Sequence, residues 1–546
     1  MSDQTTVEGV PEPEGHVNLI DTEYDIGQDN VEGSVGPFGF DIHNPVFLIS
    51  GLSVVAFVLF ALIFRETAEA AFGALRPWLT STFDWFFLSA ANIFVIFCLF
   101  LIVSPWGSVR LGGTQAVPDY TYLGWFAMLF AAGMGIGLMF FGVLEPVYHM
   151  AISEPLQTPS PFAEDGSIIA ENVEAARAQG LAATIYHWGL HPWAIYAVVA
   201  LSLALFTYNK GLPLTIRSAF YPIFGEKVWG WPGHIIDTLA VFATLFGLAT
   251  SLGFGAQQAV AGLEFVYGVP NDVTSQVVLI IIITLVALVS VLRGLDGGVK
   301  VLSEINMGVA ALLLLFVLIA GPTVIILTDF GKGLMTYVAD LVPLSTPFGR
   351  DDDSYRQGWT AFYWAWWISW SPFVGMFIAR VSRGRTVREF VICVLIIPSL
   401  VCVLWMAVFG GAAIEQVLSG DGGLVKQYVI DSYSPELSLF GMLAELPLTA
   451  ITSTIAVVLV IVFFVTSSDS GSLVIDTITA GGKIDAPVPQ RVFWCLFEGL
   501  VAIVLLLGGG LAALQAMVIS TGLPFTVVLL MMCWAIIAGL RSEKRD

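Results

Sequence analysis

Residues 131–137 read Ala-Ala-Gly-Met-Gly-Ile-Gly, in the middle of the apolar stretch Tyr122–Val143. The glycines at 133, 135 and 137 fit no single helical face, and each costs a helix about 1 kcal/mol relative to alanine. A GxxxG packing contact through Gly133 and Gly137 would explain two of them but not Gly135. We therefore favour a helix that unwinds at membrane depth and turns free backbone N–H and C=O groups toward a cavity.

The composition requires lipid as the solvent for most of the chain. Of its 546 residues, 57% are hydrophobic and 12% are charged, and the mean hydropathy is +0.83. Stretches of about 20 apolar residues, enough to cross a bilayer, recur along nearly the whole sequence. We predict an all-α polytopic membrane protein with twelve transmembrane helices, at about 45–65, 82–104, 120–143, 184–208, 233–257, 274–292, 306–328, 358–380, 388–412, 446–468, 491–511 and 515–540.

Basic residues are distributed unequally between the two sides of the predicted bundle. Twelve spans put both termini on one side, which would carry 15 Lys and Arg residues against 7 in the opposite loops. The cluster Arg380–Arg388, after the eighth span, contributes most to this difference. Because cytoplasmic loops are enriched in Lys and Arg, we predict a cell inner-membrane protein with both termini cytoplasmic.

The segments outside the predicted spans are mostly acidic. Residues 1–45 hold ten Asp and Glu and no Lys or Arg, so we predict a disordered acidic tail there, and a short charged tail at 541–546. Residues 329–357 are predicted to be an external loop, in which Lys332–Leu344 has the pattern of a surface helix. A net charge of −21 makes nucleic acid an implausible partner.

The eighth predicted span has an unusual content of tryptophan. Five of the chain's 16 tryptophans lie within Trp359–Trp370. The interfacial belt of membrane proteins explains Trp359. Three others lie one to two turns deeper, ahead of a proline that is expected to kink the helix: Trp366, Trp367 and Trp370. We interpret these deep tryptophans as the lining of a solute site.

The fourth predicted span carries a second aromatic group, in the segment 187–196. At 100° per residue, Trp188, Trp193 and Tyr196 fall within an arc of about 140° and so share one face. His187 and His191 are spaced i, i+4, but no Glu or Cys nearby in the sequence completes a metal site. We therefore interpret these histidines as structural.

An aromatic cage beside free backbone amides fits one class of solute. A quaternary ammonium or sulfonium group has no N–H to donate, but aromatic faces attract it by up to about 2 kcal/mol per ring. An anionic tail on the same molecule would bind backbone N–H groups of the unwound segment. The sequence therefore predicts a receptor for a small zwitterion, with backbone contacts from Ala132, Gly133, Met134, Gly135 and Gly137.

Hydroxyl groups end the apolar run of the tenth predicted span, in the sequence FFVTSSDS at 463–470. One interpretation is that Thr466 and Ser467 bond back to carbonyls of their own helix. The other is that they form, with carbonyls of a broken helix, an oxygen cage for Na⁺. The spacing alone leaves both interpretations open.

Together these motifs resemble the betaine/choline/carnitine transporter family, over about Phe38–Leu540. The most specific matches are GMGIGLMFFGVLEP (133–146), HWGLHPWAIY (187–196), YWAWWISWSPFVGMFIARVSRGRT (363–386) and FFVTSSDSGS (463–472). The resemblance implies a LeuT-like inverted repeat and a homotrimer in membrane lipid. It divides the spans into two peripheral helices (46–119), a first repeat of spans 3–7 (120–328) and a second repeat of spans 8–12 (358–540).

The resemblance also implies roles for individual residues. The family's aromatic box corresponds to Trp188, Trp193, Tyr196 and Trp367, and neighbouring gates correspond to Trp366 and Trp370. A central sodium site would combine three carbonyls and two hydroxyls, those of Ala131, Met134, Phe463, Thr466 and Ser467. A second sodium site would use Thr244 and Phe373, although Leu248 stands where the family has a second threonine.

The expected function is sodium-driven import of a glycine-betaine-like compatible solute by alternating access. Na⁺ is the coupling ion, and we expect no other cofactor and no enzymatic activity. Gly137 favours a zwitterion over choline, because proton-coupled choline carriers of the family tend to have an acidic residue at this position. The alternatives are a proton-coupled or exchange carrier of choline, carnitine, dimethylsulfoniopropionate or ectoine, with Glu145 or His149 as a proton relay, and more remotely a solute sensor or a channel.

Overall fold

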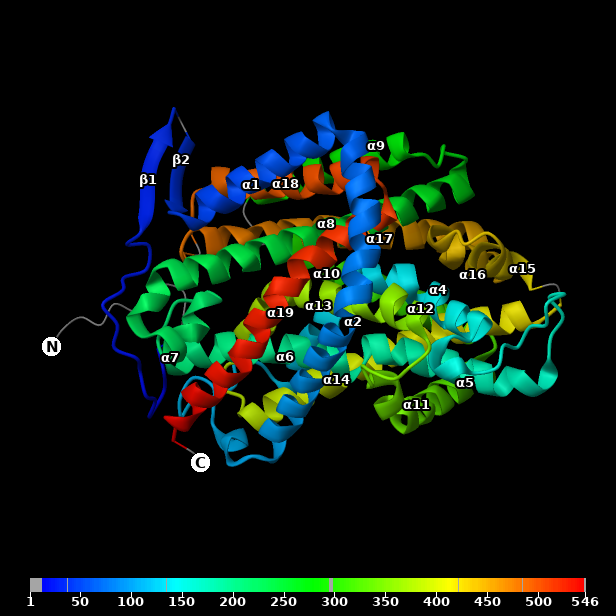
Figure 1. Cartoon of the computed structure of the whole chain (residues 1–546), viewed down its shortest axis with the longest axis horizontal. Helices are drawn as coiled ribbons and strands as arrows, with labels where there is room; N and C mark the ends of the chain where they lie inside the picture. The colour runs from blue at the N-terminus through cyan, green and yellow to red at the C-terminus, as the bar shows by residue number, and fades with distance from the viewer. Residues whose placement is uncertain are drawn as a thin grey trace.

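The computed structural model describes residues 12–36, 38–133, 135–293, 298–420, 422–483 and 485–544. Helices that cross at varied angles make up nearly all of it (Figure 1). The longer helices are α1 (Val46–Ile63), α2 (Arg65–Val103), α3 (Tyr122–Gly133), α4 (Ile136–Ile152), α5 (Ala170–Trp188), α6 (Leu190–Ala204), α8 (Trp231–Tyr267), α9 (Val273–Arg293), α10 (Gly298–Ala320), α11 (Thr323–Ser345), α13 (Ala361–Arg380), α14 (Val387–Leu418), α17 (Thr449–Thr479), α18 (Val488–Leu507) and α19 (Leu511–Arg541).

Shorter elements connect these helices. They are β1 (Asn30–Val35), β2 (Phe38–His43), α7 (Tyr221–Phe224), α12 (Asp353–Tyr355), α15 (Gly423–Lys426) and α16 (Ser438–Ala444). The wider π-helical turns are Leu205–Asn209, Arg356–Thr360 and Gln427–Asp431. Single 3₁₀ turns lie at Pro105–Ser108, Pro155–Gln157, Arg217–Phe220, Gly225–Trp229 and Pro435–Leu437.

The lengths and composition of the helices are those of a polytopic membrane protein. Within the described residues, ten helices are long and apolar enough to cross a membrane, or eleven if α3 and α4 form one bent span. Helix α13, at the predicted eighth span, is 20 residues long but less apolar, because it is rich in Trp and Ser. The all-α polytopic fold is confirmed, whereas the number twelve depends on α13 and stays a prediction.

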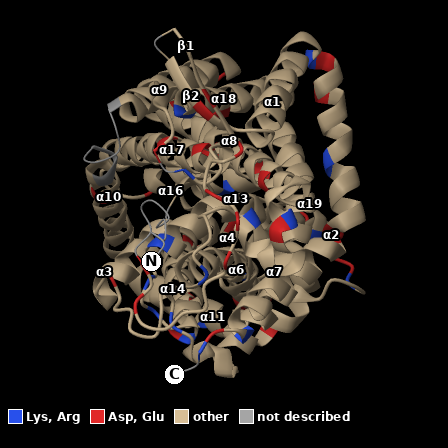
Figure 2. Ribbon diagram, turned by 90° about the vertical axis from the view of Figure 1, so that its left-hand side faces the viewer, with Lys and Arg blue, Asp and Glu red and all other residues tan. Residues whose placement is uncertain are grey.

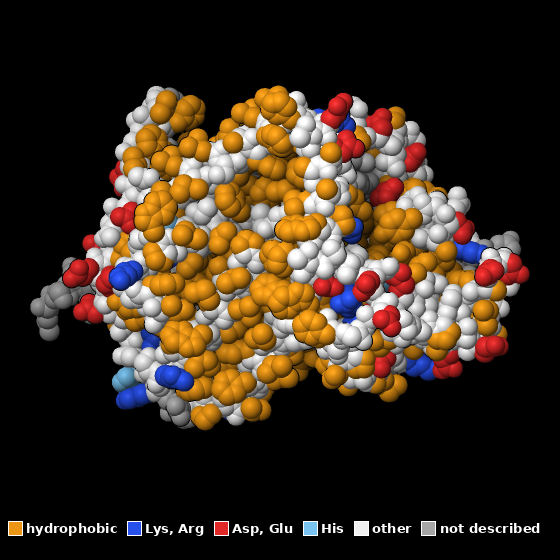
Figure 3. All heavy atoms as spheres, in the orientation of Figure 1, with side chains coloured by type: hydrophobic (Ala, Val, Ile, Leu, Met, Phe, Trp, Pro, Cys, Tyr) orange, Lys and Arg blue, Asp and Glu red, His pale blue; other side chains and the backbone are white. Residues whose placement is uncertain are grey.

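Burial separates the central helices from the peripheral ones. The span formed by α5 and α6 is 94% buried inside the protein, but that of α10 is only 22% buried. Hydrophobic side chains spread over the middle of the face in Figure 3, and charged side chains gather mostly toward its left and right ends. This distribution fits a lipid-facing perimeter around a packed centre, with α1, α9 and α18 together at one edge (Figure 1).

The helix break predicted from the glycine spacing is present. Helix α3 ends at Gly133, α4 begins at Ile136, and the two axes are bent by 69°. Gly135 between them is extended, with φ −177° and ψ −170°. The peptide groups around Gly135 therefore leave the helical hydrogen-bond ladder at the centre of the protein.

The described part of the N-terminal segment is ordered, so the prediction of a disordered tail is wrong for residues 12–45. Strands β1 and β2 pair in an antiparallel hairpin. Lys483 binds Asp41 (2.5 Å), and Arg383 binds Glu14 (2.5 Å). Three of the acidic side chains, Glu14, Glu32 and Asp41, thus pair with cations from distant loops, which the composition of the segment alone could not reveal. In the ribbon of Figure 2, acidic and basic residues are interspersed near both labelled chain ends.

The two ends of the described chain lie on the same face of the bundle. Lys210 Nζ contacts the backbone oxygen of Asn18 (3.2 Å) and pairs with Glu543. An even number of membrane crossings requires this arrangement.

The predicted boundary between the seventh span and the external loop, at 328/329, falls inside α11. This helix packs on α5 and α14. Arg177 of α5 binds Asp329 of α11 and Glu415 of α14, each at 2.8 Å. The region beyond the seventh span is thus largely a helix clamped to the bundle by ion pairs.

Candidate solute-binding site

A cavity of about 290 Å³ lies where α3, α4, α5, α6, α8, α10, α13 and α17 meet. At about 30 Å³ for a water-sized group, it has room for a solute of roughly ten non-hydrogen atoms. Both the broken pair α3–α4 and the tryptophan-rich α13 border it. Most of the predicted site residues line it: Ala131, Ala132, Gly135, Gly137, Trp188, Tyr196, Trp366, Trp367, Trp370, Phe373, Phe463, Thr466 and Ser467.

The four rings predicted to form the aromatic box are packed together. The centroid of the Trp367 ring lies 5.4 Å from that of Trp188, 5.9 Å from that of Trp193 and 5.0 Å from that of Tyr196. Trp367 comes from α13, and the other rings come from α5 and α6. Trp188, Tyr196 and Trp367 thus reach the cavity from two distant parts of the chain.

Trp193 has a supporting place in this group. It is fully buried, with its ring edge-on to Tyr196 at 5.4 Å and to Trp367 at 5.9 Å. It therefore packs behind two rings that line the cavity, where it limits their movement.

The two predicted gate tryptophans are hydrogen-bonded to α8. Trp366 Nε1 donates to Ser251 Oγ (3.1 Å), and Trp370 Nε1 donates to the backbone oxygen of Gly247 (3.0 Å). A Cβ atom at Gly247 would lie 3.1 Å from Trp370 Cδ1, so the glycine permits this close approach of α8 and α13. The bonds hold both rings against one wall of the cavity.

The broken helix supplies the polar wall. Gly135, Ile136 and Gly137 line the cavity, and α4 begins there, where the first N–H groups of a helix have no acceptor within it and the helix dipole is positive. A Cβ atom at Gly137 would lie 2.8 Å from Trp188 Cη2 and 3.1 Å from Trp366 Cη2. The absence of a side chain at 137 therefore lets both indoles approach the backbone. Gly133 ends α3, whereas Met134 lies outside the described residues.

Of the two arrangements that the sequence left open for the hydroxyls of α17, the bond back to the helix is formed by Thr466, and the sodium cage stays a prediction. Thr466 Oγ1 donates back to Val462 O (3.0 Å) or Phe463 O (3.2 Å). Thr466 and Ser467 also line the cavity on the same side as Phe463. A hydroxyl that donates one hydrogen bond keeps lone pairs for a cation, so these oxygens can serve as sodium ligands.

The second predicted sodium site stays a prediction, and its two residues have different surroundings. Phe373 lines the cavity, but Thr244 is buried within α8 and donates to the backbone oxygen of Ala240 (2.8 Å). Leu248, one turn further, packs against Gly471 of α17. An apolar side chain thus stands where a ligand oxygen would be needed.

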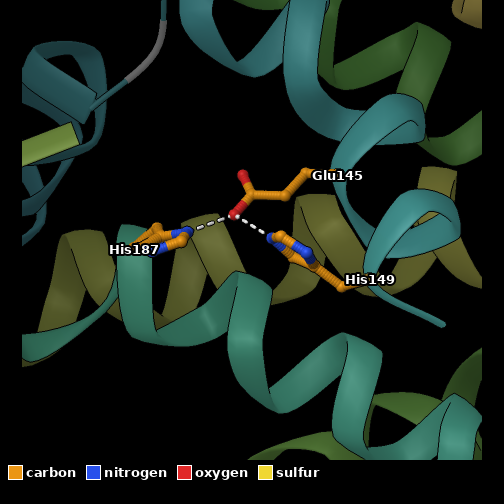
Figure 4. Close-up of side chains that lie close together, drawn as sticks. All are labelled: Glu145, His149 and His187. Atoms are coloured by element: carbon orange, nitrogen blue, oxygen red, sulfur yellow. Dashed lines mark hydrogen bonds and ion pairs between the residues drawn. The ribbon is translucent and has the colours of Figure 1, made fainter. Parts of the chain in front are cut away.

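Glu145, His149 and His187 were each noted in the sequence, but their meeting in one polar cluster behind the box was not predicted. Glu145, His149 and His187 meet in the buried space between α4 and α5 (Figure 4). Glu145 also accepts a hydrogen bond from Trp188 Nε1 (2.8 Å). Glu145 and His187 are 42 positions apart, so a search for partners close to His187 in sequence could not find the carboxylate.

The fold and the cavity define a membrane solute carrier: apolar helices enclose a solute-sized aromatic chamber beside a helix break at membrane depth. The sequence profile of the betaine/carnitine/choline family of transporters matches residues 45–545. The chain belongs to this family, and it is a transporter rather than an enzyme.

The chain is similar to curated relatives over almost its full length. It is 62% identical to a glycine betaine/proline/choline transporter of Vibrio parahaemolyticus (98% of this chain, 97% of the relative). It is 57% identical to glycine betaine transporter 1 of the same organism (97% and 98%) and 43% identical to the glycine betaine transporter OpuD of Bacillus subtilis (92% and 95%). A solved mutant of the manganese transporter of Eremococcus coleocola has a TM-score of 0.41 at 14% identity (78% and 88%), which is too remote to carry an argument.

Proposed function

We propose that the chain imports a small methylated onium zwitterion, glycine betaine or a similar compatible solute, together with Na⁺ and by alternating access. The observation that carries this proposal is the convergence of Trp188, Tyr196 and Trp367 on one cavity that the start of α4 also borders. Aromatic faces attract the methylated cation, and the N-terminal amides of a half-helix attract the carboxylate.

The names of the relatives support this class of solute. The relatives at 62%, 57% and 43% identity are all named for glycine betaine. The first is also named for proline and choline. Competition by choline therefore tests the expectation that glycine at position 137 favours a zwitterion over choline.

The shape of the cavity supports alternating access. Its lining follows α13 from Trp366 through Trp370 to Phe377, toward the helix end that carries Arg380. In the other half of α13, Tyr363 is fully buried and packs on Phe141, with ring centroids 5.4 Å apart. The chamber therefore extends along one half of α13 and is sealed along the other half. Alternating access requires such a state, in which the site is closed toward one side of the membrane.

Uptake by the purified chain in proteoliposomes tests the proposal. Radiolabelled glycine betaine should accumulate with an inward Na⁺ gradient and fail to accumulate when K⁺ replaces Na⁺. Unlabelled carnitine, dimethylsulfoniopropionate, ectoine, proline and choline should then be ranked as competitors. Full uptake without Na⁺ would contradict sodium coupling, and absence of competition by any onium solute would contradict the aromatic-box assignment.

Replacing both hydroxyl residues, Thr466→Ala with Ser467→Ala, should raise the Na⁺ concentration for half-maximal uptake. Since even indirect partners of a bound ion are worth about tenfold in affinity, we expect about tenfold or more for two ligands. Ser470→Ala is the matched control, because Ser470 lines the same cavity from the same helix but is not a predicted ligand. An equal effect of the control would contradict the assignment.

Proton coupling is the second candidate, because Glu145, His149 and His187 are titratable and buried together. An inward proton gradient without Na⁺ should drive uptake in that case. It should not do so under our proposal.

We also propose a homotrimer with both termini cytoplasmic and two inverted repeats at the boundaries given above. Chemical cross-linking in native membranes tests the trimer, and reporter fusions at the two termini test the orientation. A reporter signal from outside the cell would contradict the orientation.

A further inference from the structure

Glu145 is a fully buried carboxylate close to the solute cavity. Its Oε1 faces His149 Nε2 (3.3 Å) and His187 Nδ1, and its Oε2 accepts from Trp188 Nε1 (2.8 Å) and Tyr363 Oη (2.6 Å). A carboxylate has two oxygens with about four lone-pair sites. All four are therefore used if both imidazoles donate to Oε1.

The surrounding contacts are consistent with that pattern of donors. If His187 donates from Nδ1, its Nε2 is free to accept, and Thr360 Oγ1 lies 2.9 Å away as a donor. The rings of His187 and Tyr363 are stacked, with centroids 4.5 Å apart. One carboxylate thus collects donors from α4, α5 and α13, and each of these helices also borders the cavity.

Trp188 connects the carboxylate to the cavity. The Trp188 ring lines the cavity and lies edge-on to Trp367, with centroids 5.4 Å apart. Cation–π attraction depends on the ring presenting its face to the cation. A charge-assisted hydrogen bond at Nε1 fixes the rotation of the indole about its side-chain bonds.

We propose that Glu145 is a positioning residue for the onium end of the solute. It sets the orientation of Trp188 and links that ring to Tyr363 of α13, so solute affinity depends on a carboxylate that the solute does not touch. The inference rests on the proposed function, because it concerns affinity for a methylated onium group.

A divalent metal ion is the competing interpretation of the same cluster. One ligand atom from each of Glu145, His149 and His187 lies within 4.8 Å of the others. To bind a metal, both imidazole nitrogens would have to lose their protons and coordinate the ion instead of donating hydrogen bonds to Oε1. The close pairing of Oε1 with both rings favours hydrogen bonds over an ion-sized space between them.

The test measures the dissociation constant of glycine betaine by calorimetry on the full chain in lipid nanodiscs. Glu145→Gln leaves one oxygen and places an NH₂ group against two donors, so affinity should fall about tenfold, as expected for losing a bond to a charged acceptor. Trp188→Phe should also weaken binding. In the Trp188→Phe background, Glu145→Gln should add little, because its effect passes through the Trp188 indole.

A second pair of variants keeps the test informative if Glu145→Gln fails to fold. Tyr363→Phe removes only the hydroxyl that donates to Oε2 and should weaken binding about threefold or more. Tyr186→Phe is its matched control, because the Tyr186 hydroxyl is buried and, among the described residues, does not bond to Glu145. Dimethylglycine has one N-methyl group fewer than glycine betaine, so the ratio of its dissociation constant to that of glycine betaine measures how well the site recognises the third methyl group. This ratio should also fall in Glu145→Gln and Tyr363→Phe, because a rotated Trp188 ring no longer distinguishes that methyl group.

Each outcome decides between the interpretations. Unchanged affinity in Glu145→Gln or Tyr363→Phe, or additive effects of Glu145→Gln and Trp188→Phe, would overturn the positioning role alone. Zn²⁺ binding by the wild type that His149→Gln abolishes would overturn it in favour of a metal site. Failure of the wild type to bind glycine betaine would overturn both this inference and the proposed function.

Discussion

Trp367→Leu is expected to lower glycine betaine uptake at low solute concentration by about a hundredfold. The substitution removes one cation–π contact of up to about 2 kcal/mol and the ring that packs on all three other box residues, at centroid distances of 5.0–5.9 Å. Leucine keeps an apolar side chain at the position, so the loss reports the aromatic face. Initial uptake rates, normalised to the amount of protein in the membrane, provide the measurement.

Trp364→Leu is the matched control for this experiment. Trp364 lies three positions earlier on α13 and is also buried, but its ring stacks on His191 at 5.5 Å and packs on Tyr186, away from the cavity. It should lower the amount of folded protein more than the solute affinity of that protein. Equal losses of affinity in the two variants would mean that the effect is one of packing, and the box assignment would fail.

The sequence was most informative where the physics is local. Apolar length predicted the membrane helices. Every turn of a membrane span must satisfy its own backbone hydrogen bonds, because the surrounding lipid offers none. The glycines at 133, 135 and 137 predicted the break between α3 and α4, because their cost to a helix depends on neighbouring residues only. Periodicity put Trp188 and Tyr196 on one face of a continuous helix, and both line the cavity, but the helix is interrupted at Gly189, so Trp188 ends α5 and Tyr196 belongs to α6.

What the sequence could not give depends on contacts between distant segments. In the N-terminal segment, Glu14 and Asp41 pair with Arg383 and Lys483, each more than 300 positions away. The cluster at Glu145 needs α4, α5 and α13 in place before its donors meet. Thr244 was assigned to a sodium site by resemblance alone, and that assignment stays a prediction.

Gly137→Ala is expected to reduce glycine betaine uptake about tenfold or more. A Cβ atom at this position would lie 2.8 Å from Trp188 and 3.1 Å from Trp366, well inside the favourable carbon–carbon separation of about 3.5–4.0 Å. Both rings are held by hydrogen bonds, to Glu145 and Ser251, so neither can withdraw without losing one. Gly135→Ala is the matched control, because a Cβ there meets nothing within 4 Å and the backbone is extended. Comparable losses in the two variants would show that helix unwinding, rather than space for the rings, sets the requirement for glycine.

Gly137→Asp adds a charge to the same steric change, and the comparison with Gly137→Ala separates the two effects. A carboxylate at the start of α4 would compete with the solute carboxylate for the backbone N–H groups, so glycine betaine uptake should fall below that of the alanine variant. Choline, which has the methylated head without a carboxylate, should lose less or gain, because the new anion can pair with it. The ratio of choline to glycine betaine uptake in the two variants is the measurement. If the ratio is the same in Gly137→Asp and Gly137→Ala, glycine at 137 is retained for the space it leaves to Trp188 and Trp366, and it carries no preference for a zwitterion.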